Sequence, residues 1–256
     1  MDLPKFRKLV QQKALYFCGA RNFDDPFEGE YAWGKQGHNR FLKAQAELCQ
    51  THGSSMPLEM FIALNLKNLK DIAQKTYINC WHRSAHESEA MWKLYCENPA
   101  EGVVVCSSIE KLRVQLGRHE LPNLQLKPVR YLRDFWIKNY NPEPDVFISK
   151  RVAFEHEREF RAVFQDRDAP INLEPIVHGK LVDVNISELV SEVRLSPFAS
   201  TDFAAEVDQV ISDSGLDLRV GPSEIETHPI LAVEEQVMAR GDNWYQSSMR
   251  LRSRDA

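Results

Sequence analysis

Short runs of apolar and β-branched residues recur along the chain, and segments with helical periodicity separate only some of them. Because several of these runs follow one another without a helix between them, the pattern favours a mixed, mostly antiparallel sheet flanked by helices. The expected strands lie at 15–18, 76–81, 102–106, 126–137, 160–164, 181–184, 193–195 and 216–220. The expected helices lie at 5–14, 39–50, 57–74, 84–97, 107–117, 143–154 and 200–215. The sequence therefore predicts an α/β protein of the α+β type.

The length of the chain, 256 residues, is near the upper limit of what one hydrophobic core supports. No internal repeat, low-complexity tract or Gly/Ser-rich linker divides the sequence. We therefore expect a single domain over residues 1–226 and a C-terminal tail over residues 227–256. The five cysteines are widely spaced and form no C-x-x-C pair, which argues against a disulfide framework and against a thiolate zinc site.

Charge and hydropathy limit where the protein acts and what it binds. The longest apolar stretches are the length of a strand, far below the roughly 20 residues that span a bilayer. The first residues contain no apolar signal segment, so we expect a cytoplasmic protein with no membrane contact. The net charge is −5, and the basic part of the sequence is the tail, with Arg240, Arg250, Arg252 and Arg254. This composition disfavours stable binding to duplex nucleic acid, although brief contact with a nucleic-acid substrate stays open.

Three carboxylates and two aromatic rings lie within the six residues 23–28, in a polar loop after the first expected strand. Phe23 and Phe27 could hold the face of a sugar or a ring, while Asp25 and Glu28 accept hydrogen bonds from its hydroxyls. We therefore predict that these four residues bind substrate. The alternative is an Asp-Pro turn whose two phenylalanines anchor the loop to the core.

A second candidate segment begins where the expected strand 76–81 turns into a helix. Free backbone N–H groups at such a helix start favour an anion, and Ser84 with Glu87 forms a capping box. Trp92 and Tyr95 lie on the flank of this helix and could stack on a ring; the alternative is that both belong to the core. The histidines near the turn lack the one-face spacing of a zinc motif, so we expect no metal.

A third candidate segment is the Glu-Arg-Glu-Phe-Arg sequence at 157–161. On a strand, alternate residues share a face, so Glu157, Glu159 and Arg161 lie on one side, about 7 Å apart in steps of two residues. Phe160 belongs to the opposite, buried side. Two carboxylates that close disfavour joint ionisation, which can leave one of them as an acid or a base. The alternative is a solvated strand face whose charges neutralise one another.

Taken together, these segments resemble a bacterial domain-of-unknown-function family. Its members share, in order, the motifs F-N-D-P-F-E, C-F-S, M-W-x-x-Y, G-V-x-I and K-x-x-x-W-x-x-E-x-E-Y-R. The corresponding segments here are 23–28, 80–82, 91–95, 102–105 and 150–161. The resemblance extends over residues 15–224.

The same order of elements is more distantly similar to the plan of the ADP-ribosyltransferases. This resemblance implies an ADP-ribosyltransferase-like fold and an NAD-utilising enzyme, of a kind that could serve in phage defence or as a toxin. In those enzymes the second glutamate of E-x-E supports an oxocarbenium-like transition state, and the first positions the acceptor. Carried over, Glu159 is the catalytic carboxylate and Glu157 orients an acceptor macromolecule. The residues that the resemblance assigns to the NAD pocket are His82, Ser84, Trp92, Tyr95 and Arg161.

Two other classes of function stay open. One is a non-catalytic module that binds a nucleotide-like small molecule in the same cleft. The other is a metal-dependent nucleic-acid hydrolase with Asp24, Asp25, Glu157 and Glu159 around a divalent ion. Both catalytic interpretations require the loop 23–28 and the acids at 157 and 159 to meet in one place.

Overall fold

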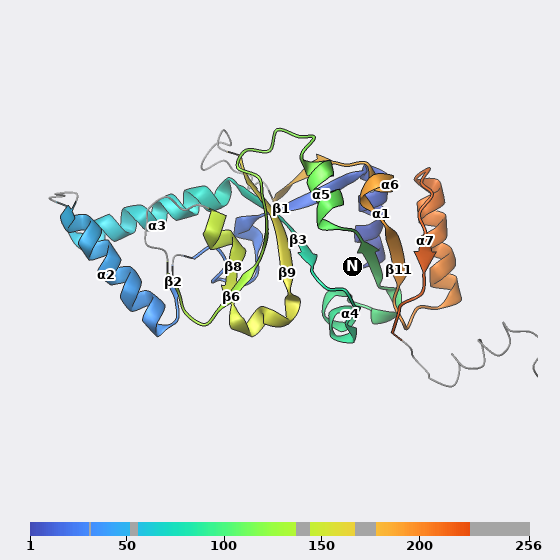
Figure 1. Cartoon of the computed structure of the whole chain (residues 1–256), viewed down its shortest axis with the longest axis horizontal. Coiled ribbons are helices and arrows are strands. Elements are labelled where there is room, and N and C mark those ends of the chain that lie inside the picture. The colour runs from blue at the N-terminus through green and yellow to red at the C-terminus, as the bar shows by residue number, and fades with distance from the viewer. Residues whose placement is uncertain (31, 52–55, 137–143, 167–177, 226–256) are drawn as a thin grey trace, which may run out of the picture.

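The computed structural model describes residues 1–30, 32–51, 56–136, 144–166 and 178–225. The protein is a mixed α/β structure (Figure 1). Its α-helices are α1 (Leu3–Gln12), α2 (Lys35–Thr51), α3 (Leu58–Gln74), α4 (Glu89–Tyr95), α5 (Ile109–Leu116), α6 (Ile186–Leu189) and α7 (Thr201–Asp213). Short 3-10 helices are η1 (Ala20–Asn22), η2 (Pro99–Glu101), η3 (Pro144–Ile148) and η4 (Val152–Glu157).

A five-stranded sheet in the order β10-β1-β3-β9-β5 forms the centre of the molecule. Its strands are β10 (Gly179–Asp183), β1 (Ala14–Gly19), β3 (Thr76–His82), β9 (Glu159–Gln165) and β5 (Gln125–Pro128). Every neighbouring pair in this sheet is antiparallel. The expectation of a mostly antiparallel arrangement is therefore confirmed.

Three smaller sheets surround the central one. β11 (Glu192–Leu195) pairs antiparallel with β4 (Val103–Cys106) and parallel with β12 (Val220–Gly221). β2 (Ala32–Trp33) pairs with β7 (Phe135–Trp136), and β6 (Arg130–Leu132) runs parallel to β8 (Ser149–Arg151). The parallel pairs make the fold mixed, as the sequence predicts.

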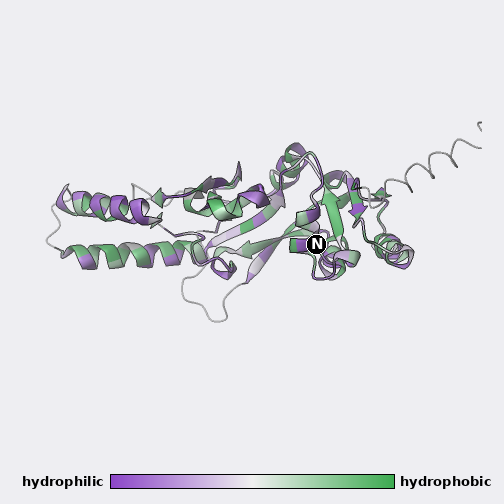
Figure 2. Ribbon diagram, turned by 90° about the horizontal axis from the view of Figure 1, so that it is seen from below, coloured by the Kyte–Doolittle hydropathy of each residue, from purple (hydrophilic) through white to green (hydrophobic). Residues whose placement is uncertain are grey.

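Two hydrophobic clusters cover the two faces of the central sheet. Phe160, Ala162 and Phe164 of β9 face the larger cluster, which includes residues of α1, α5, α6 and α7. Val163 of β9 faces the smaller cluster, to which α2, α3 and η3 contribute. In Figure 1 the first set of helices gathers near β11, and α2 and α3 extend from the opposite end of the molecule. Figure 2 shows α2 and α3 extending from the same end of the sheet.

Local capping signals explain several helix boundaries. The Ser108 hydroxyl accepts a hydrogen bond from the Lys111 N–H at the start of α5, and Ser200 accepts one from Phe203 at the start of α7. The capping box predicted at Ser84 and Glu87 does not lie at the start of a helix: α4 begins at Glu89.

Other boundaries also differ from the prediction. The helix expected at 143–154 is instead η3, β8 and η4 in succession, because β8 is recruited into pairing with β6. The long strand expected at 126–137 is divided among β5, β6 and β7, and the strand expected at 216–220 is reduced to β12.

Two statements from the sequence concern membranes and the tail. In the part of the chain that the structure describes, no helix combines the length and the apolar character needed to cross a membrane. The tail predicted over 227–256, with its arginines, lies outside the described residues.

Candidate active site

Lys150 of β8 is the centre of a buried charge cluster. Its Nζ lies 3.0 Å from Glu28 Oε1, 2.5 Å from Glu157 Oε2 and 2.8 Å from Glu159 Oε1. An ammonium group has three donors, so three carboxylates match its capacity. The lysine therefore joins the loop 23–28 to the two predicted catalytic acids.

Arg161 of β9 closes the cluster from the sheet side. Its Nε donates to Glu159 Oε2 at 2.7 Å, and its Nη1 donates to the Phe147 carbonyl oxygen at 2.9 Å and lies 2.8 Å from Glu28 Oε2. The residue is only 1% exposed. The interpretation of this segment as a solvated strand face is therefore wrong: Glu159 and Arg161 are buried.

A backbone turn brings both acids to the same lysine. Glu157 ends η4 and is not part of the strand, which corrects the prediction that all three charged residues lie on β9. Arg158 between the acids has φ 44° and ψ 47°, in the left-handed region that a residue with a side chain seldom adopts. The Tyr131 hydroxyl fixes the start of β9 by accepting a hydrogen bond of 2.7 Å from the Glu159 N–H.

The environment separates the pKa values of the two acids. Burial, together with a hydrogen bond shared with Glu159, raises the pKa of Glu157 to about 7 despite the charge of Lys150. Burial also raises the pKa of Glu159, but the hydrogen bond from Glu157 and the charges of Arg161 and Lys150 outweigh it and hold that pKa well below its usual range. Near neutral pH, Glu159 is therefore an anion, while Glu157 exchanges a proton.

The loop 23–28 packs against this cluster as well as contributing Glu28. Asp25 Oδ1 lies 2.8 Å from Arg151 Nη2 and also accepts a hydrogen bond from the Phe27 N–H. The Arg151 guanidinium lies 4.3 Å from the centre of the Phe27 ring, and that of Arg161 lies 5.2 Å from the Phe23 ring. Of the four residues predicted to bind substrate, Glu28 shares Lys150 and Arg161 with the acids and Phe23 lies over Arg161. Asp25 and Phe27 instead contact Arg151, and all these contacts also anchor the loop.

The residues predicted from the second segment divide into two groups. His82 pairs with Glu159 across β3 and β9, and its Nδ1–H donates to the Glu157 carbonyl oxygen at 2.6 Å. Tyr95 is half exposed, and burial together with the charges of Glu157 and Glu159 raises the pKa of its hydroxyl. Ser84 is exposed, and its hydroxyl accepts a hydrogen bond from the His86 N–H.

Trp92 is part of the core. It is 3% exposed, and a Cβ added at Gly102 would lie 3.0 Å from its ring, so the two are in close contact. Its Nε1–H donates to Glu87 Oε2 at 3.0 Å. Glu87 also binds Arg194, and for this reason it does not act in a capping box with Ser84. The prediction that Trp92 stacks on a ligand is not supported, because the residue is almost fully buried.

We expect Trp92→Phe to lower the free energy of unfolding by about 1–3 kcal/mol, because Glu87 then lacks one of its buried donors. Affinity for a ligand of the Lys150 cluster should not change. Urea denaturation and calorimetry measure the two quantities, with Phe198→Leu as the comparison, since Phe198 is 44% exposed and its change should cost under about 0.5 kcal/mol. A Trp92→Phe variant with parental stability and weakened ligand binding would contradict this assignment.

Three residues of the cluster had no role assigned from the sequence: Lys150, Arg151 and Tyr131. Lys150 is the first residue of the K-x-x-x-[WF]-x-x-E-x-E spacing, which was the one available signal. Tyr131 and Arg151 are drawn in by the pairing of β6 with β8. That pairing involves few residues and leaves no periodic pattern in the sequence.

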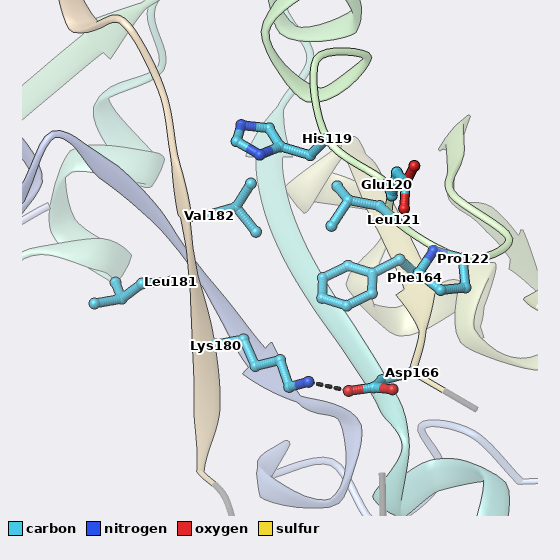
Figure 3. A pocket seen from close by; sticks show the side chains of 9 residues that line it. All are labelled: His119, Glu120, Leu121, Pro122, Phe164, Asp166, Lys180, Leu181 and Val182. Carbon is cyan, nitrogen blue, oxygen red and sulfur yellow. Dashed lines mark hydrogen bonds and ion pairs between the residues drawn. The ribbon is translucent and has the colours of Figure 1, made fainter. Parts of the chain in front are cut away.

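In the described parts of the chain, no three His, Cys, Asp or Glu side chains are arranged to hold a metal ion. A lysine ammonium stands between the acids where a hydrolase would need its divalent ion. A cavity of about 620 Å³ lies against other residues of the sheet, including Phe164, Val182 and the Lys180–Asp166 ion pair (Figure 3). None of the predicted site residues lines that cavity.

Comparison of the chain with family models, with curated proteins and with solved structures gave no match.

Proposed function

We propose that the chain is an NAD-utilising enzyme of the ADP-ribosyltransferase type, acting in the cytoplasm as a bacterial defence or toxin-like effector. The observation that carries the proposal is the pair Glu157 and Glu159, held on one lysine with pKa values moved in opposite directions. Pairs of carboxyl groups separated in this way are typical of sites that cleave glycosidic bonds. The resemblance of the motifs to ADP-ribosyltransferases supplies the substrate.

In the proposed reaction, the bond between the ribose C1 and the nicotinamide nitrogen breaks, and nicotinamide leaves with the electron pair. Positive charge develops on the ribose, and the anionic Glu159 stabilises it. In the same step the acceptor oxygen or nitrogen bonds to C1 and transfers its proton to Glu157. A carboxylate with a pKa near 7 suits that role, because it is partly ionised at neutral pH and still basic enough to take the proton.

The second candidate is a non-catalytic module that binds a nucleotide-like molecule. It is favoured by the ion pairs of Glu159, whose two oxygens are each engaged by a cation, one by Lys150 and the other by Arg161. A carboxylate whose two oxygens are both paired with cations can stabilise the fold or hold a ligand without taking part in a reaction.

Two measurements on the purified chain separate these candidates. We expect calorimetry to detect binding of NAD and of ADP-ribose at millimolar concentrations or below, and chromatography to detect free nicotinamide. The same measurements on Glu110→Gln should match the parent, because Glu110 is an exposed partner of Arg113 and has no contact with the cluster among the ion pairs described. Binding without nicotinamide release would favour the module, and no heat with NAD, NADP or ADP-ribose would exclude both candidates.

A further inference from the structure

Helix α3 carries an apolar surface that the rest of the described chain leaves largely uncovered. Most residues of α3 are apolar, yet among those whose side chains are described Leu69 alone is buried. Met60, Leu64 and Leu66 are 54%, 48% and 38% exposed. Figure 1 shows α3 extending with α2 away from the central sheet. Apolar side chains gathered on an exposed surface, unlike scattered ones, mark a site of interaction with another molecule.

One stripe of this surface has charged ends and an apolar middle. It consists of Glu59, Ala63, Leu66 and Lys70, all of them exposed. Their intervals of four, three and four residues place them on one face of the helix. The same intervals separate the contact positions of a two-helix coiled coil. The stripe therefore has the spacing of a surface on which a second helix packs.

The two charges of the stripe find no counterpart within this protein. In the part of the chain that the structure describes, neither Glu59 nor Lys70 takes part in an ion pair. They are eleven positions apart, about 16 Å along the helix axis, so they do not contact each other within one helix. Opposite charges at opposite ends make the stripe complementary to a copy of itself that runs in the reverse direction.

We infer that this stripe is the interface of a homodimer, in which α3 packs antiparallel against α3 of a second copy of the chain. A two-fold axis midway along the stripe, between positions 64 and 65, brings each Glu59 to Lys70 of the other copy. The same axis brings each Ala63 to Leu66 of the other copy, so a small residue faces a large one. A parallel pair would place like charges together, and the charges therefore select the antiparallel arrangement.

The contact extends over only a few turns of helix, so we expect a reversible dimer with a dissociation constant on the order of 10 μM. Sedimentation of the full chain at about 1 to 300 μM should show a mass that rises from monomer towards dimer. Glu59→Lys and Lys70→Glu each place like charges in both contacts, and each should weaken self-association at least about 10-fold.

Combining the two charge changes tests the pairing itself. The double variant Glu59→Lys/Lys70→Glu exchanges the two charges and should dimerise like the parent. An equimolar mixture of the two single variants should form a heterodimer of near-parental affinity, because each contact then joins opposite charges. Circular dichroism checks that every variant keeps the helix content of the parent.

Leu66→Asp tests the apolar middle of the stripe and should also weaken self-association at least about 10-fold. Val114→Asp is its control, because Val114 is 46% exposed on another helix, α5, and this change should leave the mass distribution unchanged. A parent that stays monomeric at every concentration would overturn the inference, as would a dimer that persists in Leu66→Asp and in both single charge variants. A mixture of the single variants that stays monomeric would overturn the antiparallel pairing.

Discussion

Glu159→Gln is expected to lower the rate of nicotinamide release from NAD by on the order of 100-fold or more. The amide keeps the shape of the side chain but removes the negative charge that stabilises the ribose in the transition state. Glu157→Gln should reduce hydrolysis less than transfer to a specific acceptor, because water needs less orientation than a macromolecule does. Single-turnover measurements on both variants, with Glu110→Gln as the control, check this order.

The same change should also affect stability. A glutamate on a solvated strand face would tolerate the substitution at a cost under about 0.5 kcal/mol. Glu159 is instead buried between Lys150 and Arg161, so losing its charge should cost about 1.5–3 kcal/mol in the free energy of unfolding. Activity must therefore be compared at a temperature where the variant is folded. A folded Glu159→Gln protein with parental turnover would contradict the catalytic assignment.

Lys150→Met is expected to lower the free energy of unfolding by about 3–5 kcal/mol, the largest stability effect that we predict. Methionine fills a similar volume, but it leaves Glu28, Glu157 and Glu159 without their shared cation in a buried place. Burial and the hydrogen bonds to Glu157 and Glu159 act in opposite directions on the pKa of Lys150, and the hydrogen bonds prevail, so the pKa is raised and the lysine stays charged in the native protein. Denaturant titration at neutral pH measures the loss.

Lys93→Met is the matched control for this experiment. Lys93 pairs with Glu89 one turn away on the exposed surface of α4, where an ion pair contributes about 0.3–0.5 kcal/mol. Adding Glu157→Gln to Lys150→Met should recover part of the loss, because Glu157 has then lost its ion pair with Lys150 and its charge is removed. If Lys150→Met is as stable as Lys93→Met, the cluster does not organise the site.

Much of the fold was predictable because its signals are local. The alternation of charged and apolar residues over 159–164 predicts which side chains of β9 face the larger cluster, and the structure confirms it. The helices α1, α3 and α7 lie within a few residues of where they are expected; Pro57 directly precedes α3, and Ser200 caps α7. The sequence predicts a helix for the segment that forms β8, because the pairing of β8 with β6 depends on residues elsewhere in the chain.

The composition of the site was predictable in part. The loop residues and the two acids were identified because each is unusual within a short window of sequence. Lys150 was not given a role, because its partners are 122 positions away at Glu28 and 7 and 9 positions away at the two acids. Ion pairs between segments leave no local pattern. The burial of Trp92 was equally hidden, since it depends on a glycine in another segment.

The pH dependence of kcat/KM for nicotinamide release is the most direct test of the central claim, that Glu157 and Glu159 act as a coupled reactive pair. Glu157 must be ionised to accept a proton, and its pKa is raised to about 7. The rate should therefore be low at pH 5, rise through about pH 7 and level off above it. Glu157→Gln should lose this rise and keep a reduced rate that does not change between pH 5 and 9. A parent profile with no change between pH 5 and 9, or the same rise in Glu157→Gln, would contradict the account.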